Sequence, residues 1–149
     1  MKVLLVCTSG GHFATMNGLK SFWSKHERVW VTDRNKDTEA LVDKEKIYWL
    51  PYQPPRGILK LIANIPPTLR ILRREKPDLM ISTGASVSIN FAFLAWVLGV
   101  RVVYIESISR FKELSLSGRL VYLIADEFYV QWPELCAKYP KAQFKGYAA

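Results

Sequence analysis

The sequence has few cysteines, and its first residues do not predict a secretory leader. Cys7 and Cys136 are its two cysteines, far apart in 149 residues, and their spacing matches no metal or redox motif. A disulfide-stabilised secreted domain is therefore excluded, and we expect a reducing, cytosolic compartment. The apolar run at residues 3–6 is too short for a signal peptide and has no small-residue cleavage site after it.

Long uncharged apolar runs and internal repeats are also missing. The longest such run covers residues 87–100 and is closed by Arg101. A membrane span needs about 20 residues, so we predict a buried helix there and no transmembrane segment. Because 50% of the residues are hydrophobic, a disordered chain is excluded. Collagen and coiled coil are excluded by the same composition and by the lack of repeats.

Acidic residues are fewer than basic ones. The chain has 21 Lys and Arg against 13 Asp and Glu, which gives a formal charge of +8. This excess favours a polyanionic partner, either nucleic acid or an anionic membrane surface. No helix-turn-helix, zinc-finger, RNA-recognition or KH signature is present, and the aromatic residues are not interleaved with the charges. We therefore rank the membrane first and expect no nucleic-acid partner.

Apolar runs rich in β-branched residues alternate with helical segments along the chain. We predict strands at residues 2–8, 28–33, 46–50, 78–83, 101–106 and 127–130 and near Gln143. We predict helices at residues 13–23, 36–43, 58–76, 86–98, 117–124 and 133–138. This alternation and length predict a single Rossmann-like α/β domain over residues 1–149, with a mostly parallel sheet and helices on both faces.

Ligands of such sheets bind beyond the carboxyl ends of the strands, which here are followed by residues 9–12, 84–86 and 106–110. In the first segment, Gly10 and Gly11 permit a tight turn whose free N–H groups would favour an anion. His12 would act there as a general base or as a donor to phosphate. The alternative is a glycine-rich turn whose histidine only caps the helix. The pattern is neither G-x-G-x-x-G nor a P-loop, and no acidic residue is obviously placed for a ribose.

Glu106 ends an otherwise apolar strand and is followed by Ser107 and Arg110. A carboxylate at this place can orient a hydroxyl or take up a proton. The alternative is an ion pair with Arg110 or Lys112. Burying a charge is costly unless it is paired or used, so we favour a functional role. Further on, Trp132 either belongs to the core or presents its edge to a partner chain.

The segment 56–76 is basic and also rich in apolar residues. It holds a single acidic residue, Glu75, and six basic ones: Arg56, Lys60, Arg70, Arg73, Arg74 and Lys76. Its apolar residues exceed what one packed face needs, which favours an element lying among the headgroups of an anionic leaflet. The alternative is a surface helix with a solvated cationic face. Pro66 and Pro67 should split the segment into two helices, because proline cannot continue the hydrogen-bond ladder.

Several motifs, read in order, resemble one family. They are Tyr104-Ile105-Glu106-Ser107-Ile108-Ser109-Arg110, Leu114-Ser115-Leu116-Ser117-Gly118-Arg119, Ala125-Asp126, Val130-Gln131-Trp132-Pro133-Glu134-Leu135, Lys138-Tyr139-Pro140 and the early Ser9-Gly10-Gly11-His12. Together they resemble the acceptor-side subunit of the two-component N-acetylglucosaminyltransferase that extends dolichol-diphosphate-N-acetylglucosamine. The sequence looks closest to the bacterial relatives in capsule and exopolysaccharide synthesis.

The resemblance implies a chain equivalent to the N-terminal half of a GT-B glycosyltransferase. The UDP-sugar would be bound mainly by a separate donor-side subunit, and the pair would transfer a hexose or N-acetylhexosamine to a lipid-linked diphosphate sugar. This chain would then be inactive without its partner and would need no metal or cofactor of its own. The alternative is a non-catalytic subunit that recruits the donor-side protein to the membrane.

The resemblance also suggests roles for individual residues. His12 is the first candidate for the catalytic base, and Glu106 is the second, as base or as the residue that orients the acceptor. The acceptor and its phosphates would contact Ser9, Gly10, Gly11, Gly84, Ser86, Ser107 and Arg110. Trp132 and Glu134 would contact the partner.

The family's eukaryotic members carry an N-terminal membrane anchor, whereas this chain begins directly at its first strand. The resemblance therefore implies peripheral attachment at the cytoplasmic face of the membrane. The residues expected to carry it are Arg56, Lys60, Arg70, Arg73 and Arg74.

Overall fold

Seven short strands form one parallel sheet in the computed structural model, which describes residues 1–51 and 57–148. They are β1 (Lys2–Val6), β2 (Glu27–Thr32), β3 (Lys46–Trp49), β4 (Leu79–Ser82), β5 (Arg101–Ile105), β6 (Glu127–Val130) and β7 (Ala142–Phe144). Their order in the sheet is β3-β2-β1-β4-β5-β6-β7, and every neighbouring pair is parallel. The predicted Rossmann-like α/β sheet is confirmed. The strand order reverses between β1 and β4, and such a switch point is where these sheets bind ligands.

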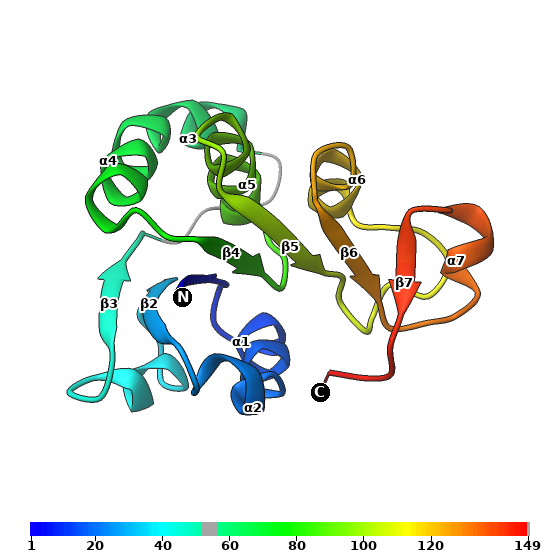
Figure 1. Cartoon of the computed structure of the whole chain (residues 1–149), viewed down its shortest axis with the longest axis horizontal. Helices are drawn as coiled ribbons and strands as arrows, with labels where there is room; N and C mark the ends of the chain where they lie inside the picture. Colours follow the sequence, from blue (N-terminus) through cyan, green and yellow to red (C-terminus); the bar gives the residue numbers. More distant parts are fainter. Residues whose placement is uncertain (52–56, 149) are drawn as a thin grey trace.

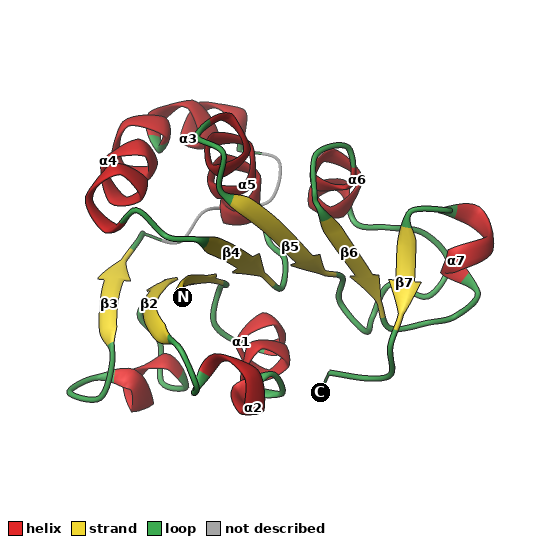
Figure 2. Cartoon of the chain, viewed as in Figure 1, coloured by secondary structure: helices red, strands yellow, loops and turns green. Residues whose placement is uncertain are grey.

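Helices cover both faces of this sheet (Figures 1 and 2). They are α1 (Gly11–Asn17), α2 (Lys20–Trp23), the 3-10 turn η1 (Thr38–Leu41), α3 (Ile58–Ala63), α4 (Ile65–Glu75), α5 (Val87–Val97), α6 (Leu116–Tyr122) and α7 (Leu135–Lys138). The helices α3 to α6 lie on one face, and α1 and α2 lie on the other.

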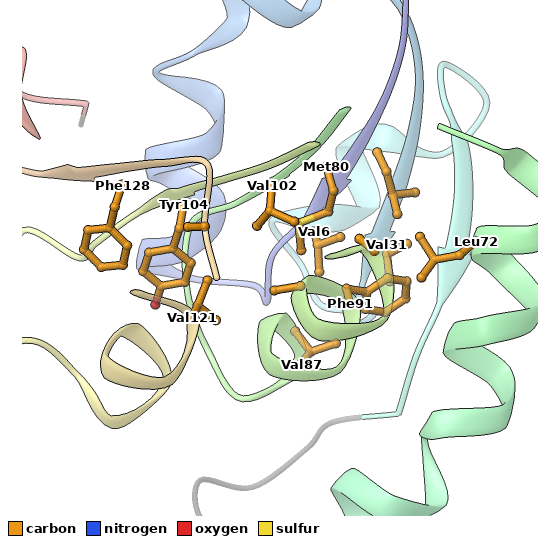
Figure 3. Close-up of a cluster of buried hydrophobic side chains, with 14 of the residues drawn as sticks. Val6, Val31, Leu72, Met80, Val87, Phe91, Val102, Tyr104, Val121 and Phe128 are labelled. Carbon is orange, nitrogen blue, oxygen red and sulfur yellow. The ribbon is translucent and has the colours of Figure 1, made fainter. Parts of the chain in front are cut away.

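Each face has its own apolar core. Under α4, α5 and α6, the strand residues Val6, Met80 and Val102 pack with Phe91 and Leu72 of the helices (Figure 3). The ring of Tyr104 stacks on Phe128 in the same core, with centroids 5.0 Å apart. On the opposite face α1 and α2 bury Phe13, Met16 and Trp23 against Trp30 of β2. The two cores hold the strand ends, and hence the loops at the sheet edge, in place.

Three predicted helices have different bounds from those expected. The helix predicted at 13–23 is broken by a turn at Gly18 into α1 and α2, and the one predicted at 36–43 is only the single turn η1. The basic segment does split in two, but at Asn64 and not at its prolines. Pro66 and Pro67 lie in the first turn of α4, where a missing N–H costs little because that group has no partner within the helix.

The expectation of a buried helix at 87–100 is wrong for its outer side. In α5, Phe91 and Ala95 are fully buried, but Trp96 is 53% and Val97 is 70% exposed. A helix that is apolar on all sides is normally covered on all sides. The outer side of α5 is not covered by the described chain, so it is an exposed apolar face. No helix in the described part of the chain has the length and apolar composition needed to cross a bilayer.

The face of the sheet beneath β4, β5 and β6 is only partly covered. A cavity of about 530 Å³ lies there, lined by apolar strand residues that include Ile81, Val103 and Tyr129. Phe22 of α2 and Tyr147 of the C-terminal segment also line it. In Figure 2 the C-terminal segment runs below the sheet toward α2, and none of the helices drawn there covers this stretch.

Candidate active site

His12 lies at the switch point between β1 and β4 and is bound there by Thr83. The imidazole Nδ1 lies 2.8 Å from the main-chain oxygen of Thr83. The Thr83 hydroxyl donates in return to the main-chain oxygen of His12, at 2.6 Å. A carbonyl oxygen can only accept, so Nδ1 carries the ring proton. The lone pair of Nε2 is then the proton acceptor of this side chain, and no residue in the described ranges binds it.

Gly84 forms the floor on which the His12 ring lies. A Cβ atom at Gly84 would stand 2.7 Å from Cε1 and 2.8 Å from Nδ1 of the ring. Gly84 has φ +120° and Ala85 has φ +76°, so two consecutive residues leave the ordinary backbone regions before α5 begins. Ser86 is the N-cap residue of that helix, and the helix N-terminus faces the same edge of the sheet. A helix N-terminus at this place favours a bound anion.

The β1–α1 loop differs from the expected anion-binding turn. The amide of Ser9 donates to Asp33 at 2.6 Å, and the amide of Gly10 donates to Asp37, also at 2.6 Å. The Ser9 hydroxyl donates to the second oxygen of Asp33. The expectation of free N–H groups is therefore wrong for Ser9 and Gly10, because two carboxylates of this chain already occupy them. A Cβ atom placed on Gly10 or Gly11 would meet no other atom within 4 Å, so the outer side of the loop is open.

Asp33 also corrects the expectation that no acidic residue is placed for a ribose. It follows β2 directly, which is where dinucleotide-binding folds hold that group. Both of its carboxylate oxygens accept hydrogen bonds from Ser9, so its role in this structure is to hold the β1–α1 loop.

Glu106 is 1% exposed and is bound by neutral donors. Its carboxylate accepts from the amides of Ser107 and Ser115, each at 2.9 Å, and from the Ser115 hydroxyl at 2.9 Å. The alternative of an ion pair with Arg110 or Lys112 is wrong, since neither cation pairs with it. Hydrogen bonds to the charged form offset the cost of burying it. Glu106 thereby closes the loop 107–115 at both ends.

Ser115 extends this network into α6. Its hydroxyl accepts from the amide of Gly118 at 3.0 Å and caps the helix. Tyr104, which precedes the loop on β5, is fully buried beside it, and within the described chain its hydroxyl has no hydrogen-bond partner. Burial, and then the charge of Glu106, raises the pKa of Tyr104 far above its usual value. Its oxygen lies 3.4 Å from the Cβ position of Gly84, so it adjoins both parts of the site.

The remaining predicted contacts lie farther out on the same loops. Arg110 is exposed, and no described carboxylate pairs with it. Trp132 is partly buried against the core, donates to the main-chain oxygen of Ile108 at 2.6 Å, and contacts Phe111 and Tyr147 edge to face. The packing of Trp132 agrees with the core alternative, and its contact with a partner chain stays a prediction. Glu134 is exposed at the start of α7.

The basic segment has two different halves. The helix α4 buries Ile71 and Leu72 and directs Arg70, Arg73 and Arg74 to solvent. The shorter α3 has no buried residue, and its Ile58, Leu59 and Ile62 are 68%, 83% and 58% exposed beside Lys60. Arg56 lies outside the described residues.

Sequence reasoning missed Thr83, Asp33, Asp37 and Ser115. Thr83 and Asp33 directly follow strands β4 and β2, so the strand-end rule applied to the other loops would have found these two. Asp37 and Ser115 lie inside loops and have no such signal. Among residues 1–51 and 57–148 no cluster of three or more His, Cys, Asp or Glu side chains is arranged to hold a metal ion.

Comparison with known proteins identifies the family of this chain. The family model described as "Oligosaccharide biosynthesis protein Alg14 like" matches residues 55–148. The chain is 27% identical over 177 residues to the human UDP-N-acetylglucosamine transferase subunit ALG14, covering 98% of this chain and 82% of that protein. It is 29% identical over 98 residues to the subunit of the same name from Yarrowia lipolytica, covering 62% of this chain but 45% of the relative.

Among solved structures, that of Acinetobacter baumannii MurG matches 99% of this chain with a TM-score of 0.75 at 14% identity. The match covers 45% of that longer chain. At this identity the likeness concerns the fold alone, and it agrees with the fold of one half of a GT-B protein. The family model covers well over half of the sequence, including the loops around Gly84, Glu106 and Trp132. The chain therefore belongs to the Alg14 family of oligosaccharide biosynthesis proteins.

Proposed function

We propose that this chain is the acceptor-side half of a two-subunit glycosyltransferase. A partner subunit would bind most of the UDP-sugar, and the pair would transfer its hexose or N-acetylhexosamine to a lipid-linked diphosphate sugar. The observation that carries the proposal is the fixed imidazole of His12 at the switch point of half a GT-B fold. The names of the relatives, which are subunits of UDP-N-acetylglucosamine transferases, support the same reaction class.

His12 would act as the general base. A hydroxyl of the acceptor sugar attacks the anomeric carbon of the donor, and Nε2 of His12 takes the hydroxyl proton. The new bond is the glycosidic C–O bond, the bond between the anomeric carbon and the phosphate oxygen breaks, and UDP leaves with the electron pair. We expect inversion at the anomeric carbon, because a single displacement needs one base and one leaving group.

The lipid diphosphate would bind at the start of α5. Gly84 and Ser86 place the helix N-terminus at the sheet edge, and Arg110 and Ser107 stand on the neighbouring loop. Negative charge is favoured there by the helix dipole and the guanidinium. Asp33 and Asp37 disfavour a phosphate at the β1–α1 loop, so Gly11 and the open side of that loop would instead approach the neutral acceptor sugar.

Glu106 fits the second of its two suggested roles. Its carboxylate is buried and bound by Ser107 and Ser115, which leaves it no access to a substrate hydroxyl. It would therefore orient the acceptor indirectly, by holding the loop that carries Arg110.

The partner would bind over the loops at the carboxyl edge of the sheet. Trp132, Phe111 and Tyr147 form a row of edge-to-face rings there, and Phe111 and Tyr147 are 56% and 63% exposed. Partly exposed aromatic groups are frequent binding anchors in interfaces. Glu134 lies on the same side, in the loop after β6.

The membrane would be met by the outer faces of α3, α5 and α6. These helices lie on one side of the sheet (Figure 1). Their exposed apolar residues are Ile58, Leu59, Ile62, Trp96, Val97, Leu98, Leu116, Leu120 and Leu123. Lys60 and the arginines of α4 stand beside them, and apolar residues flanked by cations suit an anionic bilayer surface. We also propose a peripheral position at the cytoplasmic face and a role in capsule or exopolysaccharide synthesis, as the expected resemblance to bacterial relatives implies.

The first experiment measures transfer from labelled UDP-galactose, UDP-glucose and UDP-N-acetylglucosamine to a lipid-diphosphate-sugar acceptor. Each donor is tested with this chain, with the candidate donor-side protein, and with both. We expect transfer only in the mixture. Equal transfer by the partner alone would make this chain a recruiter without catalytic function.

In the mixture, His12→Gln should lower kcat by about 10²- to 10⁴-fold, which is the usual contribution of a general base. His26→Gln is the matched control, since His26 is the other histidine of the chain and lies just before β2, at the opposite edge of the sheet and against Phe22. Full activity of His12→Gln with normal partner binding would remove His12 from the mechanism.

A further inference from the structure

We propose that Thr83 is a positioning residue that fixes the ring and the tautomer of His12. This inference rests on the proposed role of His12 as base and adds a residue to which the family motifs gave no role. The two residues are 71 positions apart in the sequence and bind each other twice. One bond runs from the imidazole to the main chain of Thr83, and the other runs from the Thr83 side chain to the main chain of His12.

The two hydrogen bonds have different roles. The hydroxyl of Thr83 fixes the His12 backbone, at the start of α1, relative to the end of β4. The carbonyl of Thr83 then meets Nδ1 at 2.8 Å, and a ring that donates from Nδ1 keeps Nε2 unprotonated. Thr83 is fully buried, so its own carbonyl and hydroxyl are shielded from water.

Gly84 completes the arrangement. The ring lies on its Cα face, at a distance where a Cβ atom would meet Cε1 and Nδ1 below 3.0 Å. The carbonyl of Thr83 thus lies against one edge of the ring, and the backbone of Gly84 lies against its face. Rotation of the imidazole by half a turn would lose the Nδ1 bond and would place Cε1, which cannot accept a proton, where Nε2 now lies.

Without the hydroxyl, the backbone of His12 is no longer held by Thr83, and the ring is therefore no longer fixed against the Thr83 carbonyl. We expect Thr83→Val to give a mixture of tautomers, because the carbonyl remains but is no longer aligned with Nδ1. Thr83→Ser keeps the hydroxyl and loses only a methyl group, so it should restore the single tautomer. This pair of variants separates the hydrogen bond from the packing of the side chain.

The test uses ¹⁵N-histidine labelling of the full chain, which gives two imidazoles, those of His12 and His26. His26→Gln assigns the signals, and the ¹⁵N shifts of the ring distinguish the two tautomers. We expect Nδ1–H at His12 in the unmodified chain and in Thr83→Ser, and a mixture in Thr83→Val. An Nε2–H tautomer in the unmodified chain, or an unchanged spectrum in Thr83→Val, would overturn the inference.

Transfer by the assembled pair gives the second readout. Thr83→Val should lower kcat by about ten- to a hundredfold, with KM nearly unchanged, because the base is misplaced while the binding groups remain. Thr83→Ser should stay close to the unmodified pair. If Thr83→Val is fully active while His12→Gln is impaired, the positioning role is wrong and the base stands. If His12→Gln is itself fully active, the proposed function of His12 fails, whatever its tautomer.

Discussion

At the residue scale, the strongest electrostatic feature outside the site is Glu75, at the end of α4. Its side chain is 1% exposed and pairs with Lys2 at 2.8 Å and with Lys46 at 2.7 Å, while Tyr48 also donates to it. Burial alone would raise the pKa of Glu75, but the hydrogen bonds from Lys2, Lys46 and Tyr48 outweigh it and lower the pKa to about 2. This carboxylate joins β1, β3 and α4 at the amino-terminal edge of the sheet, opposite the site.

The depressed pKa predicts an acid-sensitive stability. The charged form of Glu75 is favoured by folding, so its contribution is complete above the ordinary carboxyl pKa of 4.5 and is lost as the pH falls toward about 2. Glu75→Gln should therefore lower the free energy of unfolding by about 2–3 kcal/mol at pH 7. The difference from the unmodified chain should shrink progressively below pH 4.5.

Urea unfolding of both chains at several pH values measures this difference. Glu113→Gln is the control, because Glu113 forms its ion pairs with Arg119 and Lys138 on the surface. A Glu75→Gln chain whose stability matches the unmodified one at pH 7 would contradict the buried network.

The loops of the candidate site could be predicted from the sequence, but the hydrogen-bond partners of its residues could not. His12, Gly84 and Glu106 were predicted because each lies in or beside the segment that follows an apolar strand, and the carboxyl ends of parallel strands meet at one edge. The hydrogen bonds to Thr83, 71 residues away, and to Ser115, in a loop, depend on strand order and loop shape. The order of residues along the sequence reveals neither the strand order nor the loop shape.

At the element scale, the start of α6 depends on a glycine. Gly118 is buried, and a Cβ atom there would overlap the Glu106 carboxylate. Helix interiors ordinarily favour alanine over glycine by roughly 1 kcal/mol, so this glycine is explained by its neighbour and not by propensity. The close approach of α6 to Glu106 is what lets Ser115 serve both as helix cap and as ligand of the carboxylate.

Gly118→Ala should consequently destabilise the chain by about 1–3 kcal/mol, the usual cost of overpacking. It should also lower transfer by the assembled pair, because Glu106 would move and release the loop that carries Arg110. Thermal unfolding and the transfer assay measure the two effects. Ser117→Ala, one residue earlier in the same turn, is the matched control, and a Gly118→Ala chain as stable and active as this control would refute the packing argument.

The element bounds that sequence reasoning misjudged have local physical causes. The pair Pro66 and Pro67 was expected to end a helix, but proline is also compatible with a first helical turn, and the chain uses it there. The run 87–100 was expected to be buried because it lacks charge. Its exposed outer side shows that composition predicts a preference for an apolar surrounding and does not say whether this chain supplies it.

At the scale of the whole molecule, α3 to α6 form one helix layer (Figure 1), and this layer carries exposed apolar residues such as Leu59 and Val97 beside the exposed Arg73 and Arg74. We expect the chain to bind vesicles that contain anionic phospholipid, and to bind them more weakly as the salt concentration rises. Arg73→Glu with Arg74→Glu should weaken binding at least about tenfold, at roughly 1 kcal/mol per charge. Leu59→Ser should weaken it at every salt concentration, since it removes apolar contact and no charge.

Vesicle sedimentation measures this binding, with zwitterionic vesicles for comparison. The matched control is Lys36→Glu with Lys44→Glu, which changes the net charge by the same amount on exposed residues before and after η1. Equal loss of binding in the control would show that net charge, and not this surface, attracts the chain. Binding that does not respond to salt would contradict electrostatic attachment.

The pairing of His12 with Thr83 has a consequence for the order of events during folding. The strand β1 pairs with β2, which follows it about 25 residues later in the sequence. Its pairing with β4 must wait until the intervening β3, α3 and α4 have been passed. Closing the longer loop costs more chain entropy, so the central β1–β4 seam is expected to form late. Before β4 has paired with β1, His12 can already be part of a helix, but Thr83 is not yet in place to orient its ring. Under the proposed role of His12, the site becomes chemically competent only when the β1–β4 seam closes.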